Sequence, residues 1–303
     1  MKRKNVSWKK YFIFILILSI PFSLIVIRLL AFKAGEEFQV STYTNSHQQF
    51  PAVAMDEKGN FVIAWCSWGQ DGSTGGVFAQ RFNKKGKAIG SEFQVNTYTN
   101  SHQQFPAVAM DAKGNFVITW HSYGKDGSGY GIFAQRFNKK GKATGSEFQV
   151  NTYTKSAQHP AVAMDGTGNF VITWESYGGD GSLEGVFAQR FNKKGKAIGS
   201  EFQVNTYTND DQSNPTVAMD EKGNFVITWH SYGQDGSMFG IFAQRFNKKG
   251  KAIGEEFQVN TYTNAQQLWP AIAMDKKGNF FITWESSGQD GSGYGIFAKM
   301  FQK

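Results

Sequence analysis

The 303-residue chain contains very little cysteine and proline, and it lacks several motifs of common catalytic sites. Cys66 is the only cysteine, which excludes an intramolecular disulfide, and we expect it to be a small buried thiol on a strand. No H-E-x-x-H, G-x-S-x-G or phosphate-loop motif occurs, which argues against the enzyme classes that use them. With only six prolines and 40% hydrophobic residues, the chain has the composition of a folded protein.

A long apolar run occurs only at the N-terminus. Residues 1–10 are basic, and residues 11–32 would form an apolar helix about 33 Å long, enough to cross a bilayer. Because the cationic residues precede this segment, we predict a cytoplasmic flank (1–10), a transmembrane signal-anchor (11–32) and an extracytoplasmic remainder. The alternative is a signal peptide that is cleaved, followed by secretion. No cysteine directly follows the apolar run, which excludes a bacterial lipid anchor.

Two motifs recur with a period of 54 or 55 residues after this segment. The motif E-F-Q-V begins at Glu37, Glu92, Glu147, Glu201 and Glu256. The motif W-x-S begins at Trp65, Trp120, Trp174, Trp229 and Trp284. A fixed period of this size indicates a propeller, a solenoid or an array of small domains.

Each repeat has the pattern of four short strands, and no helical period appears after residue 35. In the first repeat we expect strands at residues 51–55, 60–67, 76–83 and 92–98, separated by Gly-, Asn- and Asp-rich turns. Four antiparallel strands form a propeller blade. Because residues 37–42 are a lone fourth strand and the last repeat has only three, we expect the N-terminal strand to complete the last blade. The predicted fold is an all-β, five-bladed β-propeller over residues 36–303.

The repeat PAVAMDxxGNFVITW…DGSxxGIFAQRF resembles the propeller-like repeats of bacterial surface and secreted proteins, and the resemblance covers residues 36–302. It implies an extracytoplasmic β-propeller. The chain is also similar to tachylectin-type lectins, but only in blade number, which says little about a ligand.

Lysine-rich turns between the third and fourth strands should form one face of the propeller. They are centred on Lys84, Lys85, Lys139, Lys140, Lys193, Lys194, Lys248 and Lys249. These turns account for the net charge of +8, and we predict that they face the membrane and meet anionic lipid headgroups. The alternative is a set of solvated turns that protect strand edges. The turns carry no interleaved aromatic residues, so we do not expect nucleic-acid binding.

The opposite face should carry the loops between the second and third strands, each with an Asp-Gly-Ser triplet. The five aspartates are Asp71, Asp126, Asp180, Asp235 and Asp290. An aspartate before glycine usually caps the backbone of its own turn. Calcium is the one metal considered, but it requires six to eight oxygen ligands and each loop offers one carboxylate, so no cofactor is predicted. The tryptophan of each W-x-S motif should pack in the core between blades.

A few positions differ among otherwise identical repeats. The residue before the proline is Phe50, Phe105, His159, Asn214 or Trp269; the residue after the tryptophan is Cys66, His121, Glu175, His230 or Glu285; and the loop carries Thr74, Tyr130, Glu184, Phe239 or Tyr294. Variable loops on a rigid scaffold are common binding sites, although drift at exposed positions would look the same. The predicted ligand-binding residues are the five aspartates with His121, Tyr130, His230, Phe239, Trp269 and Tyr294.

Three functions are compatible with these observations. The leading prediction is a monomeric, membrane-anchored, non-enzymatic binding or adhesion module whose similar sites hold a glycan through multivalency. The second is a structural scaffold that binds a protein ligand. The third is a glycoside hydrolase that uses Glu175, Glu285 or His121, and it is disfavoured because no catalytic motif accompanies these residues.

Overall fold

The structure is a computed structural model that describes residues 35–127, 129–153 and 156–303. The predicted cytoplasmic flank and transmembrane segment lie outside these residues. Within the described ranges, no helix has the length and apolar character needed to cross a membrane. The chain divides into two units, Met1–Gln39 and Val40–Lys303, and the second contains every strand described below.

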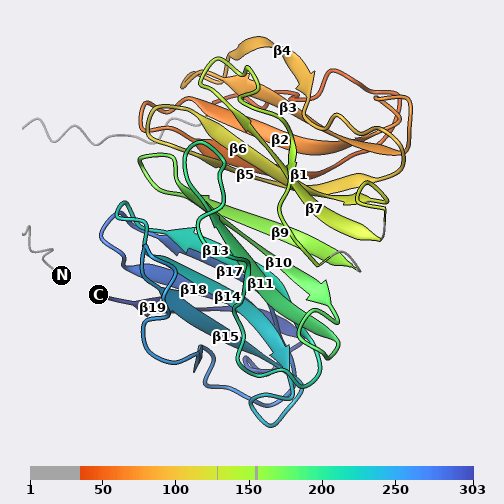
Figure 1. The fold of residues 1–303 in the computed structure, drawn as a ribbon. Coiled ribbons are helices and arrows are strands. Elements are labelled where there is room, and N and C mark those ends of the chain that lie inside the picture. Colours follow the sequence, from red (N-terminus) through yellow and green to blue (C-terminus); the bar gives the residue numbers. More distant parts are fainter. Residues whose placement is uncertain (1–34, 128, 154–155) are drawn as a thin grey trace, which may run out of the picture. The chain divides into compact units, whose positions relative to one another are not determined.

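The second unit consists of five antiparallel sheets, which fit a five-bladed β-propeller (Figure 1). The first blade contains β1 (Gln48–Met55), β2 (Phe61–Trp68), β3 (Gly75–Phe82) and β4 (Ala88–Gln94). The second contains β5 (Gln103–Met110), β6 (Phe116–Tyr123), β7 (Tyr130–Phe137) and β8 (Phe148–Gln149). The third contains β9 (Ala157–Met164), β10 (Phe170–Tyr177), β11 (Glu184–Phe191) and β12 (Phe202–Gln203). The fourth contains β13 (Gln212–Met219), β14 (Phe225–Tyr232), β15 (Phe239–Phe246) and β16 (Phe257–Gln258).

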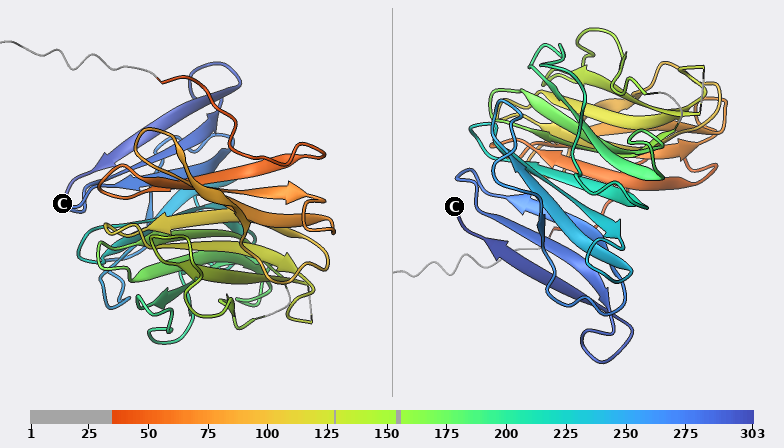
Figure 2. Two further views of the ribbon diagram at one scale, coloured as in Figure 1. Left: turned by 90° about the horizontal axis from the view of Figure 1, so that it is seen from above. Right: turned by 60° about the horizontal axis from the view of Figure 1, so that its bottom comes forward.

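The fifth blade differs from the prediction. It contains only β17 (Gln267–Met274), β18 (Phe280–Ser287) and β19 (Tyr294–Phe301), the blue strands in Figure 2. Residues 35–47 form no strand, so the predicted N-terminal fourth strand is not formed in this structure. A strand is defined by a ladder of backbone hydrogen bonds to a neighbour, and no such ladder is found for residues 37–42.

The fifth blade also departs from the repeat on the face that points away from the fourth blade. Phe281 and Met300 stand where the other blades carry valine and arginine. These two side chains and Ile296 are 49%, 51% and 74% exposed, whereas the valines equivalent to Phe281 are buried. The fifth blade therefore presents an apolar face that the other blades cover with their neighbours.

The hydrophobic core lies between adjacent sheets. Trp120, Trp174 and Trp229 are fully buried, each packed with phenylalanine and isoleucine of its own blade and valine or alanine of the preceding one. Cys66 is also buried. The predicted core role of the W-x-S tryptophans and the buried thiol are therefore confirmed.

The lysine turns of the second, third and fourth blades are held in place by arginines from the preceding blade. The Arg81 guanidinium donates to the carbonyl oxygens of Lys139 and Lys140 at 2.7 and 2.6 Å, and the Arg190 guanidinium bonds the Lys248–Lys249 turn in the same way. Both lysine side chains of each turn are exposed. The turn is thus fixed by its backbone, and the ammonium groups remain in solvent.

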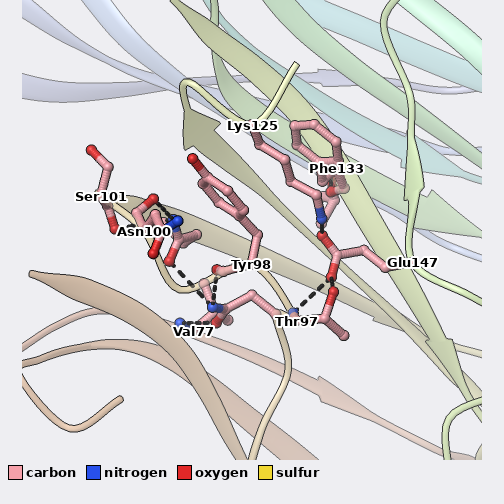
Figure 3. Close-up of polar contacts among 11 residues, drawn as sticks. Val77, Thr97, Tyr98, Asn100, Ser101, Lys125, Phe133 and Glu147 are labelled. Atoms are coloured by element: carbon pink, nitrogen blue, oxygen red, sulfur yellow. Dashed lines mark hydrogen bonds and ion pairs between the residues drawn. The ribbon is translucent and has the colours of Figure 1, made fainter. Parts of the chain in front are cut away.

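The loops at the opposite end of each blade are tied to the next blade by a glutamate (Figure 3). Glu147 accepts hydrogen bonds from the backbone N–H and the hydroxyl of Thr97, both at 2.7 Å. Its other oxygen pairs with Lys125, whose ammonium lies 4.5 Å from the centre of the Phe133 ring. Burial lowers the pKa of Lys125 to about 8. These contacts give the loop face a rigid base.

Candidate functional site

Each innermost strand has an irregularity at the residue that precedes its proline. The ladder between first and second strands shifts register there, as between Gln49 and Ala52 in the first blade. The five residues at this position have φ between 46° and 54°, in the left-handed region: Phe50, Phe105, His159, Asn214 and Trp269. Non-glycine residues rarely adopt this conformation, and a following proline disfavours it further. The same strain therefore occurs in all five blades at positions whose side chains differ.

These five residues and the prolines after them line one cavity of about 270 Å³. Because all five innermost strands contribute, the cavity lies where the blades converge, and we call it the axial cavity. The rings of Phe50 and Phe105 stack with their centroids 4.0 Å apart. Trp269 is 55% exposed. His159 and Asn214 are the polar side chains contributed by this set.

A buried carboxylate lies directly behind the polar wall of the axial cavity. Glu175, on β10, is 4% exposed. One of its oxygens lies 2.6 Å from Nδ1 of His159, and the other accepts a hydrogen bond of 2.7 Å from the backbone N–H of Asn214. Both oxygens of Glu175 are therefore satisfied, one by its own blade and one by the next blade.

Two further acidic residues surround Glu175 at the junction of the third and fourth blades. Glu184 begins β11 and pairs with Tyr177, two residues from Glu175 on the same face of the sheet. Asp211 precedes β13, and its carboxylate accepts a hydrogen bond from the backbone of Glu184. We call Glu175, Glu184 and Asp211 the acidic cluster.

The surroundings of the acidic cluster shift its proton equilibria. Burial raises the pKa of Glu184 to about 7, helped by the nearby charges of Glu175 and Asp211. Burial also raises the pKa of Asp211. Burial acts to lower the pKa of His159, but the hydrogen bond and charge of Glu175 outweigh it, and the net shift is upward. Glu184 can therefore carry a proton near neutral pH.

The two predicted histidines, His121 and His230, lie at the blade junctions on either side of the acidic cluster, and both are neutral. Burial lowers the pKa of His121 to about 3 and that of His230 to about 4. His121 packs against Phe105 and Tyr130, and neither ring nitrogen has a hydrogen-bond partner among the described residues. His230 lies 2.8 Å from the Ser213 hydroxyl. Both histidines contribute to the walls behind the axial cavity.

The predicted aromatic residues fall into two groups. Trp269 lines the axial cavity. Tyr130, Phe239 and Tyr294 begin the third strand of their blades, outside that cavity, and Tyr130 and Phe239 pack against His121 and His230. The strand register places Gly75 at this position in the first blade, so Thr74 lies one residue before it.

The Asp-Gly-Ser aspartates serve their own turns. Asp71, Asp180, Asp235 and Asp290 each accept a hydrogen bond of 3.1 Å from the backbone N–H of the following serine. Asp126 accepts a hydrogen bond of 3.4 Å from the side-chain amide of Gln149. No aspartate of this set lines the axial cavity, and the described part of the chain contains no cluster of His, Cys, Asp or Glu suited to a metal ion. The structure thus places these five residues in turns and brings none of them to the acidic cluster.

Sequence reasoning singled out Glu175 and noted Glu184 as variable, but it did not connect them and it missed Asp211. A signal was present in the repeats. Glu184 replaces glycine or an aromatic residue, and Asp211 stands where blades one and two carry histidine. Glu184 and Asp211 are thus acidic residues that replace non-acidic ones in two neighbouring blades, and together with Glu175 they indicate one site.

Comparison with known proteins identifies the fold. No family model matches the chain, and no match was found among curated proteins. Among solved structures, a protein of unknown function from Dyadobacter fermentans is similar with a TM-score of 0.59, at 14% identity over 84% of this chain and 78% of that one. The GH93 α-L-arabinofuranosidase of Fusarium graminearum, in complex with arabinobiose, has a TM-score of 0.53, at 13% identity over 82% and 80%. The Penicillium chrysogenum α-L-arabinanase with arabinobiose has a TM-score of 0.51, at 15% identity over 81% and 73%.

These neighbours correct the functional prediction. The two with a named activity are glycoside hydrolases, which contradicts our expectation of a non-enzymatic binding or scaffolding module. At this level of identity the likeness shows the shared propeller fold alone. The chemistry of this chain must therefore be argued from its own residues.

Proposed function

We propose that this protein hydrolyses glycosidic bonds, with the acidic cluster as its catalytic centre. The observation that carries the proposal is the pairing of Glu184, whose pKa is raised to about 7, with the neighbouring carboxylates of Asp211 and Glu175. Glycoside hydrolysis requires one carboxyl group that holds a proton and another that is ionised. The glycoside hydrolases among the structural neighbours support the same class of reaction.

The cluster assigns a role to each residue. Protonated Glu184 donates its proton to the glycosidic oxygen as the bond to the anomeric carbon breaks. Water adds to the anomeric carbon, and its proton passes to the carboxylate of Asp211, the more exposed of the other two acids. Glu175, buried and bonded on both oxygens, positions His159, and after burial it is the next largest cause of the raised pKa of Glu184.

Arabinose-containing oligosaccharides are the first substrates to test, because both enzymatic neighbours bind arabinobiose. The full chain would be assayed on a panel of chromogenic and natural glycans alongside Glu184→Gln and Asp211→Asn. We expect each substitution to reduce kcat by about 100-fold or more. Glu285→Gln is the matched control, since it removes a carboxylate at the position equivalent to Glu175 in the fifth blade. Equal activity in all four proteins would exclude the acidic cluster as the catalytic centre.

We further propose that the enzyme works outside the cytoplasm, with residues 11–32 as its anchor and the lysine turns against anionic lipid. The basic residues before the apolar segment, the resemblance to bacterial surface repeats and the exposed ammonium groups of the turns support this placement. Each lysine near the surface would contribute about 1 kcal/mol. Substituting Lys84, Lys139, Lys193 and Lys248 by glutamine should weaken binding to anionic but not zwitterionic liposomes; no lipid dependence would refute the lipid contact.

A further inference from the structure

The axial cavity combines two features that are independent of the acidic cluster. The five residues before the prolines that line it all have positive φ, and the side-chain chemistry at this position varies among the repeats. A non-glycine residue in this conformation costs on the order of 1–3 kcal/mol, and such strain gathers at ligand sites. Packing alone does not explain why all five strained residues line the same cavity.

The walls of the axial cavity have the chemistry that a sugar ring requires. Trp269 and the Phe50–Phe105 pair offer apolar faces for the C–H side of the ring. Asn214 and Nε2 of His159 offer polar groups, and both residues are held by Glu175. The volume of about 270 Å³ is near the lower end for ligand cavities, so it suits one sugar residue and not an extended chain.

The strand order sets the distance from this cavity to the proposed acid. The cavity is lined from β9, Glu175 lies on β10, and Glu184 lies on β11. Because neighbouring strands are about 4.8 Å apart, Glu184 stands about 10 Å outward from the innermost strand. A sugar in the axial cavity would therefore place its linkage to the next sugar toward Glu184, with the rest of the chain leading away from the axis.

We propose that the axial cavity is the subsite for the terminal sugar of a glycan, and that the enzyme consequently removes single sugars from chain ends. This inference rests on the proposed glycoside hydrolysis. His159 and Asn214 orient the terminal residue, Trp269 stacks on it, and the strained backbone holds these three side chains in place. A volume of about 270 Å³ holds one sugar residue, so the terminal residue is the part of the glycan that the cavity binds.

The test compares products and binding in the full-length protein. Wild type, Trp269→Leu and the control Phe281→Leu, which alters an exposed ring of the same blade outside the cavity, would act on a linear oligosaccharide and on the same compound blocked at its non-reducing end. We expect monosaccharide as the only early product, no cleavage of the blocked compound, and a KM raised about tenfold by Trp269→Leu but not by Phe281→Leu.

The outcomes separate the two proposals. Early release of mixed oligosaccharides, or equal cleavage of the blocked compound, overturns chain-end action and leaves glycoside hydrolysis intact. Absence of hydrolysis by wild type on every glycan overturns the proposed function. In that case, binding of the free monosaccharide is measured by tryptophan fluorescence. Quenching that Trp269→Leu abolishes would support the cavity as a sugar site, and absence of quenching would overturn the cavity proposal too.

Discussion

The backbone N–H of Asn214 donates a hydrogen bond of 2.7 Å to Oε2 of Glu175, across the junction of two blades. Asn214 can make this bond because its positive φ turns the N–H away from its own ladder. The strained backbone of Asn214 in the fourth blade thus donates a hydrogen bond to the buried carboxylate of Glu175 in the third blade. The remaining oxygen of Glu175 is left for His159, whose free ring nitrogen can then serve the axial cavity.

The stability of the protein should fall as pH rises through the range in which Glu184 ionises. Its folded-state pKa, about 7, lies above the ordinary value of 4.5, so the protonated form favours folding. This contribution is fully present below pH 4.5 and is lost as pH approaches and passes 7. Glu184→Gln should raise the melting temperature at pH 8 more than at pH 5. An equal effect at both values would contradict the raised pKa.

Removing His159 should destabilise the third and fourth blades. His159→Ala leaves one oxygen of buried Glu175 without its partner, and we expect a loss of about 2–3 kcal/mol in unfolding free energy near pH 6. The loss should shrink in the double variant His159→Ala/Glu175→Gln, which removes the uncompensated charge. His47→Ala, an exposed histidine in the first blade, is the control and should change stability little.

Glycine should be better than alanine at Trp269, the reverse of the usual order within a strand. The φ of 53° costs an alanine about 1 kcal/mol and a glycine almost nothing. Chemical denaturation should therefore find Trp269→Gly about 1 kcal/mol more stable than Trp269→Ala. On the same strand, Ala273→Gly should be destabilising, because Ala273 is not among the residues with positive φ. The usual order at Trp269 would mean that the strain is not present in solution.

The arginine hydrogen bonds to the lysine turns should stabilise the protein only in the blades that are followed by such a turn. Arg81→Met removes two hydrogen bonds to the Lys139–Lys140 turn and should cost about 1–2 kcal/mol in unfolding free energy. Arg245→Met is the matched control, because Arg245 is exposed and no hydrogen bond from its guanidinium is found among the described residues. Similar losses in both variants would show that packing of the aliphatic part of the arginine side chain, and not its hydrogen bonds to the turn, provides the stability.

Cys66 should be inert toward alkylating reagents while the protein is folded. The thiol is buried, and burial raises its pKa to about 12, so almost no thiolate is present at pH 8. Mass spectrometry after iodoacetamide treatment should show labelling only after denaturant is added. Rapid labelling of the native protein would show that the first blade opens in solution.

Much of the architecture follows from the repeats. The period of 54–55 residues predicted five blades, and the W-x-S motifs predicted the buried tryptophans. The first and fourth strands of the first blade differ most from the predicted bounds: β1 begins at Gln48 and passes through Pro51 by a shift of register, and β4 spans Ala88–Gln94. The predicted first strand begins at Pro51, whereas the irregularity at Phe50 accommodates this proline, which lacks an N–H donor, within a longer strand.

The sequence by itself determined the strands of each blade, because short runs of β-branched and aromatic residues between Gly-, Asn- and Asp-rich turns are sufficient to specify them. Only the tertiary structure decided which departures from the repeat meet. Glu175, Glu184 and Asp211 come from separate strands and two blades, and their proximity depends on the packing of one sheet against the next. The raised pKa of Glu184 has the same origin, since burial and neighbouring charge exist only once the blades have assembled.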